Sequence, residues 1–106
     1  MDEVKKIVWT TIALKQRNST FEYWNERNKS NIYSVKYNSK IKERLVQLKY
    51  FPEIGIETIF PKTRIIYLGY YSILYQIKDQ NIIITGFWDN RQDPKKLLDL
   101  LKDSSN

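Results

Sequence analysis

The spacing of apolar residues changes once along this 106-residue chain, close to Glu53-Ile54-Gly55. Before that point apolar side chains recur at about the repeat of a helix, and after it they alternate, as in a strand. Helices followed by consecutive strands are typical of an α+β domain, in which the helices pack on one face of a mainly antiparallel sheet. This change of period constrains the fold more than any other feature of the sequence.

Two amphipathic helices are predicted before the change of period. The first follows a cap at Thr10 or Thr11 and ends near Asn28, and the second ends at Phe51-Pro52, because the residue before a proline avoids helical angles. The residues that share one mainly apolar face are Ala13, Leu14, Arg17, Phe21 and Trp24 in the first helix, and Tyr37, Ile41, Leu45 and Leu48 in the second. Each helix has a stripe to bury, and a short polar turn joins the two into a hairpin.

One strand is predicted before the helices and three after them. The first spans 4–9, and the others span 63–68, 71–78 and 81–88, with Asp79-Gln80 as a hairpin turn. A last short helix is expected after Asp93-Pro94, with an apolar stripe at Leu97, Leu98, Leu100 and Leu101. The predicted order is β-α-α-β-β-β-α, a helical hairpin packed on a small sheet in one domain, 1–106.

The composition excludes several kinds of chemistry. The chain has no cysteine and no histidine, which excludes disulfides, thiolate nucleophiles, imidazole acid–base chemistry and the usual zinc sites, and we expect no cofactor. The net charge of +6 favours phosphate or acidic protein partners. The apolar run Ile82-Ile83-Ile84 is too short to span a bilayer, and the start Met1-Asp2-Glu3 is unlike a signal peptide. We therefore expect a cytoplasmic protein without a membrane partner.

Five stretches of the chain carry a recognisable pattern. The first two are Val8-Trp9-Thr10 with Ala13-Leu14, and Phe21-Glu22-Tyr23-Trp24. The other three are the connector 48–55 with its proline and glycine, Arg64 followed by the strand 71–77 with its two tyrosines, and 83–88 followed by Arg91-Gln92-Asp93-Pro94. In this order they resemble the RelE/ParE superfamily of bacterial toxins, over nearly the whole chain.

The resemblance implies a growth-inhibiting toxin from a two-gene module, neutralised by an acidic, partly disordered antitoxin. Some members cleave mRNA in the ribosomal decoding site, and others inhibit DNA gyrase without cleaving anything; the fold does not choose between them. Cleaving members typically carry an arginine at the position of Ser72, and some carry a catalytic tyrosine at the position of Leu97. We therefore favour gyrase inhibition, with ribosome-dependent mRNA cleavage and a non-toxic binding module as alternatives.

The resemblance also points to two arginines. Arg91 and Arg64 match family positions and would stabilise charge if the protein cleaves RNA, because a guanidinium pairs bidentately with phosphate. The plainer interpretation is that Arg91 pairs with Asp89 or Asp93, and that Arg64 packs its stem and exposes its head.

For gyrase inhibition, we expect the partner-binding residues around the last strand and the last helix. These residues are Trp88, Arg91, Leu97 and Leu101. Trp88 is expected to be the most exposed aromatic, whereas five others occupy apolar-periodic positions and are expected in the core: Trp9, Trp24, Tyr37, Tyr71 and Tyr75. The antitoxin is expected to bind in the groove beside the hairpin and at the edge of the sheet.

Overall fold

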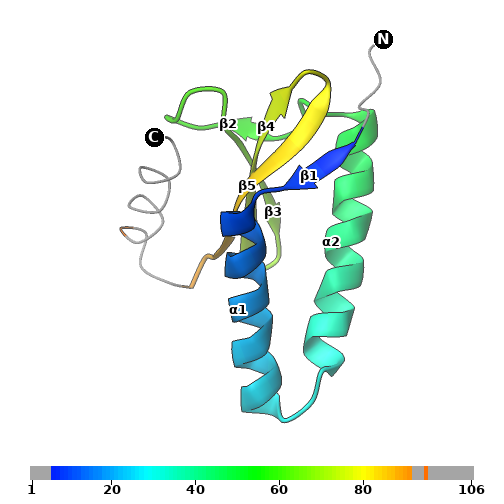
Figure 1. The fold of residues 1–106 in the computed structure, drawn as a ribbon, viewed down its shortest axis with the longest axis vertical. Helices are drawn as coiled ribbons and strands as arrows, with labels where there is room; N and C mark the ends of the chain where they lie inside the picture. The colour runs from blue at the N-terminus through cyan, green and yellow to red at the C-terminus, as the bar shows by residue number, and fades with distance from the viewer. Residues whose placement is uncertain (1–5, 92–94, 96–106) are drawn as a thin grey trace.

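A computed structural model describes residues 6–91 and Lys95. Five strands form one mixed sheet, in the order β1-β5-β4-β3-β2, and a pair of antiparallel helices packs against it (Figure 1). The elements are β1 (Ile7–Trp9), α1 (Thr11–Asn28), α2 (Ile32–Tyr50), β2 (Ile56–Glu57), β3 (Arg64–Leu68), β4 (Tyr71–Lys78) and β5 (Asn81–Asp89). The predicted α+β architecture, with a helical hairpin on a small sheet, is confirmed.

Both ends of α1 have a local signal. The hydroxyl of Thr10 accepts a hydrogen bond from the backbone N–H of Ala13 at 3.1 Å, which caps α1 as predicted. Lys29 adopts a left-handed conformation with φ of 53°, and its N–H donates back to the last turn of α1. The chain then reverses into α2, and the two helices extend together beyond the sheet (Figure 1).

Three antiparallel strands, β3, β4 and β5, form the centre of the sheet. Asp79 and Gln80 have φ of 52° and 67°, as a two-residue hairpin turn requires, so the predicted turn is confirmed. At the edges β1 pairs in parallel with β5, and β2 pairs with β3. The sequence pattern does not predict β2, because two residues are too few to show an alternation.

The main core lies between the hairpin and one face of the sheet. Tyr71, Ile73 and Tyr75 of β4 are completely buried there, against residues such as Ile41 and Leu48 from the inner side of α2. The prediction of a core position is therefore confirmed for Tyr71 and Tyr75.

The other three aromatics predicted for the core are only partly buried. Trp9 and Tyr37 pack against the edge of the core. Trp24 is half-buried, and its ring contacts a charged side chain, Arg91. An apolar-periodic position thus locates an aromatic ring on the correct side of a helix, but it does not determine how deeply the ring is buried.

The centre of the opposite face of the sheet is buried as well. By alternation Ser72 and Leu74 of β4 point away from the helices, yet each has an exposed fraction of only 1%. The predicted last helix, with Leu97 and Leu101, lies outside the described residues. Among the residues that the structure describes, no helix is long and apolar enough to cross a membrane.

Candidate functional site

A bulge in β5 decides which side chains reach the candidate site. Ile84 faces the helices, and strict alternation would turn Trp88 the same way. The pairing with β4 shifts register here and leaves Thr85 without a partner strand residue, so Phe87 and Asp89 face the helices instead. The end of β5 therefore presents a carboxylate, and not an indole, to the hairpin.

Asp89 and Arg91 form a two-point ion pair at this end of β5. The Nε and Nη2 atoms of Arg91 donate to the two carboxylate oxygens of Asp89 at 2.8 and 2.7 Å, and the backbone N–H of Arg91 donates to the same carboxylate at 2.9 Å. The Asp89 side chain is only 6% exposed. Burial alone would raise the pKa of Asp89, but the hydrogen bonds from Arg91 outweigh it, so this pKa is lowered. The same hydrogen bonds raise the pKa of Arg91.

Aromatic rings enclose the guanidinium of Arg91. Its central carbon lies 4.6 Å from the ring centroid of Trp24 and 4.4 Å from that of Tyr70, with Tyr71 at 5.8 Å. A cation held over ring faces is stabilised by the quadrupole of each ring. We call Arg91, Asp89, Trp24, Tyr70 and Tyr71 the arginine cage.

The cage continues into a chain of aromatic contacts that joins the hairpin to the sheet. In order of contact, its rings are Phe21, Phe87, Tyr71, Tyr37, Tyr33 and Trp24, with neighbouring centroids 4.8 to 6.0 Å apart. The hydroxyls of Tyr33 and Tyr71 share a hydrogen bond of 2.5 Å. Burial, followed by this hydrogen bond, raises the pKa of Tyr71. A general base needs a pKa near the working pH, so this shift makes Tyr71 a poorer base.

Ser72 lies next to the cage in sequence but on the other face of the sheet. Its hydroxyl is buried and bonds to Oδ1 of Asn90 at 2.5 Å. Ser72 therefore has a structural partner at the position where cleaving members of the resembled superfamily carry an arginine.

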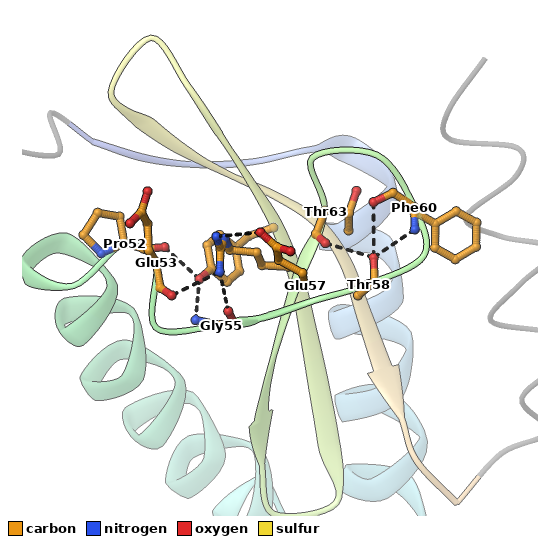
Figure 2. Close-up of polar contacts among 9 residues, drawn as sticks. Pro52, Glu53, Gly55, Glu57, Thr58, Phe60 and Thr63 are labelled. Carbon is orange, nitrogen blue, oxygen red and sulfur yellow. Dashed lines mark hydrogen bonds and ion pairs between the residues drawn. The ribbon is translucent and has the colours of Figure 1, made fainter.

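Arg64 holds the connector between α2 and β3, and Figure 2 labels the connector residues Glu53, Gly55 and Glu57 among the polar contacts there. Its Nη1 atom donates to the carbonyl oxygens of Glu53 at 3.1 Å and Gly55 at 2.7 Å, and its Nη2 atom pairs with Glu57 at 3.2 Å. The head of Arg64 therefore contacts the protein itself, which corrects the expectation of an exposed head on a packed stem.

Tyr75 holds the same connector from the core side. Its hydroxyl donates to the carbonyl oxygen of Pro52 at 2.8 Å and accepts from the N–H of Gly55 at 2.9 Å. A Cβ atom added to Gly55 would lie 2.5 Å from this hydroxyl, so the position requires glycine. We call Arg64, Tyr75 and the residues they hold, Pro52, Glu53, Gly55 and Glu57, the connector clamp.

The structure does not bring Arg64 and Arg91 together. In the register of the sheet, Arg64 lies opposite Tyr75, whereas Asp89 lies opposite Tyr71, four residues earlier on β4. Four residues of strand span about 13 Å, and the two arginines also lie on opposite sides of β4, so they do not form a joint phosphate site.

An open groove of about 520 Å³ lies between α1 and the end of β5. Its lining residues are Ser19, Thr20, Tyr23, Trp24, Asp89 and Arg91. Within residues 6–91 and Lys95, no three acidic side chains lie close enough to hold a metal ion. The groove therefore offers aromatic rings, hydroxyls and a paired guanidinium, a set suited to contacts with another protein.

The sequence matches a family model over most of its length. The model described as "ParE toxin of type II toxin-antitoxin system, parDE" matches residues 7–94. The chain belongs to the ParE toxin family. A search of curated protein sequences found no match.

A solved structure supports the fold of this ParE-family chain. It is described as "Chromosomal ParDE TA system from P. aeruginosa", and its alignment covers 83% of this chain and 98% of that one, with a TM-score of 0.59. The sequence identity is 16%, so the likeness concerns the fold.

The predicted site residues of the ParE-family chain have separate positions. Arg91 lies in the arginine cage, where its predicted pairing with Asp89 is confirmed; Asp93 lies outside the described residues. Trp88 is only 7% exposed, so the expectation of an exposed aromatic is wrong: the bulge places it on the face away from the helices, opposite Ser72, and that part of the face is buried too. Leu97 and Leu101 lie outside the described residues.

Sequence reasoning missed the roles of four aromatic residues of the cage and clamp. Tyr70 was not singled out, and Trp24, Tyr71 and Tyr75 were assigned to the core without a polar role. For Tyr75 a signal exists, because a completely buried tyrosine needs a partner for its hydroxyl. For Trp24 and Tyr70 no local signal exists, since their common partner Arg91 is distant in sequence from Trp24.

Proposed function

We propose that this ParE-family toxin inhibits DNA gyrase without cleaving RNA, and that an acidic antitoxin neutralises it. The observation that carries the proposal is the state of the two candidate catalytic arginines. The guanidinium of Arg91 pairs at two points with a buried carboxylate, and that of Arg64 binds two backbone carbonyls and Glu57. Each would have to give up internal partners to stabilise a phosphorane.

The titration of the tyrosines supports the same proposal. Burial raises the pKa of Tyr37, Tyr71 and Tyr75, which moves all three phenols away from the range of a general base at neutral pH. The resembled cleavage site also has a buried, neutral serine, Ser72, at the position where cleaving members carry an arginine, so it lacks that cation.

Purified gyrase tests the target directly. We expect the wild-type toxin to inhibit ATP-dependent supercoiling of relaxed plasmid, and growth to stop when the toxin is induced in cells. Primer extension on cellular mRNAs, minutes after induction, should give no new 5′ ends inside reading frames. Discrete new ends would establish the ribosome-dependent nuclease instead, and unaffected growth would establish a non-toxic binding module.

A further inference from the structure

The helix α2 has two apolar stripes on opposite sides. The inner one packs on the sheet, as predicted. The outer one consists of Ile32, Val35, Val46 and Tyr50, which are 73%, 59%, 52% and 69% exposed. At about 100° per residue these four positions fall within an arc of about 60°, so they form one line along the helix. We call them the outer stripe of α2.

The outer stripe is unusual because its residues are aligned. Isolated exposed apolar residues are normal on a protein surface, and α1 has two of them, Ile12 and Tyr23. The outer stripe instead runs from the first turn of α2 to its last, which is about 27 Å at 1.5 Å per residue. Ser39 occupies the middle of the same line. A helix apolar on two faces has a second face to cover.

The helix that carries the outer stripe is strongly basic. The helix α2 contains five lysine or arginine residues and one glutamate, a net charge of +4, whereas α1 contains three and two, a net charge of +1. Lys42 and Lys49 lie along one side of the stripe. Lys36 and the single glutamate of the helix, Glu43, lie along the other side, and all four side chains are exposed. Most of the +6 charge of the chain is thus concentrated on this one helix.

We propose that the outer stripe of α2 is the docking surface for an acidic amphipathic helix of the antitoxin. This inference rests on the proposed neutralisation and names its surface and its chemistry. Apolar side chains at three- and four-residue steps would pack along the stripe, and carboxylates on one side of them would face Lys42 and Lys49. A second copy of the chain does not fit, because it would bring two helices of charge +4 together.

The position of the outer stripe separates it from the arginine cage. In Figure 1, α2 forms the right-hand margin of the described fold, with α1 and the sheet on its inner side. The stripe faces away from both. Substitutions in the stripe should therefore weaken antitoxin binding and leave gyrase inhibition unchanged.

The first experiment measures antitoxin affinity by titration calorimetry, with the purified product of the adjacent antitoxin gene as the probe. The variant Val35→Asp with Val46→Asp is expected to bind at least about 100-fold more weakly than the wild type, because it places two charges at the centre of an apolar contact. Ile59→Asp is the matched control: Ile59 is 87% exposed and lies between β2 and β3. Affinity of the double variant within threefold of wild type would overturn the docking surface.

A second variant keeps the test independent of any folding defect. Lys42→Glu with Lys49→Glu changes exposed charges and is expected to weaken binding about tenfold at low salt, with a smaller loss at high salt. An affinity that does not depend on these charges would contradict the role of the lysines. Wild-type toxin that fails to bind the antitoxin would instead overturn the proposed function itself.

A site-specific label locates the contact. Because the chain has no cysteine, Ser39→Cys introduces a single attachment point in the middle of the stripe, and Ile59→Cys provides the control. An environment-sensitive dye at position 39 should shift to the blue when the antitoxin is added, with no shift at position 59. A shift caused by duplex DNA and not by the antitoxin would overturn the inference and identify a phosphate-binding face.

Discussion

Arg64 and Arg91 occupy corresponding roles in the resembled family, and each pairs with a carboxylate, but their surroundings differ. Glu57, the partner of Arg64, is 80% exposed, whereas Asp89, the partner of Arg91, is 6% exposed. In the connector clamp, most of the stabilisation comes from hydrogen bonds to two backbone carbonyls. In the arginine cage, the stabilisation comes from the ion pair with Asp89, because a buried carboxylate requires its counter-ion. The same residue type thus stabilises two regions by different physical means.

The largest effect should follow from removing the guanidinium of the arginine cage. Arg91→Ala leaves the Asp89 carboxylate buried without its counter-ion and is expected to lower the free energy of unfolding by about 3 kcal/mol. Urea unfolding followed by circular dichroism measures this loss. Adding Asp89→Asn should recover about 1 kcal/mol or more, because the unpaired charge is gone. A loss below about 1 kcal/mol for the single variant would show that Asp89 is better solvated than its burial indicates.

The next effect concerns the core side of the connector clamp. Tyr75→Phe removes the hydroxyl that bonds Pro52 and Gly55, and it should cost about 2 kcal/mol because both backbone groups lose a buried partner. Tyr67→Phe is the control, since Tyr67 is 54% exposed; we expect a change within about 0.5 kcal/mol. Equal effects of the two variants in the same urea assay would mean that the clamp does not stabilise the connector.

A smaller difference should separate the two partners of the clamp. Arg64→Ala is expected to cost about 1.5 kcal/mol, because it removes the charged donor that binds two carbonyls. Glu57→Gln should change stability by less than about 0.5 kcal/mol, since an exposed ion pair contributes little. Comparable losses in both variants would show that the ion pair, and not the carbonyl contacts, holds the connector.

The smallest expected difference lies in the acid range. The pKa of Asp89 is lower in the folded chain than in the unfolded one, so the unfolded state binds more protons as the pH falls. The resulting stabilisation is complete above the unfolded pKa, about 4, and is lost as the pH falls through the folded value. Unfolding free energies at several pH values should therefore decline less steeply below pH 4 for Asp89→Asn than for the wild type. Equal slopes of the unfolding free energy below pH 4 in the two proteins would contradict the contribution of Asp89.

The fold follows from local patterns, and for that reason the sequence predicts it well. The change of apolar period places the helices and the sheet, Thr10 caps α1, and Asp79-Gln80 makes the hairpin turn. Each of these signals acts within a few residues of chain. The short edge strand β2 is missed because two residues carry no period.

The candidate site depends on one non-local detail, the bulge at Thr85. A shift of one residue exchanges the faces of everything beyond it, so Trp88 turns away from the helices and Asp89 turns toward them. Asp89 then fixes Arg91, and the hairpin supplies Trp24 to enclose it. The sequence by itself determined the elements, the charge and the family, because these depend on local order and composition. Only the tertiary structure decided which arginine is caged, which tyrosine holds the connector and which aromatic is exposed, because strand register and burial depend on contacts between distant segments.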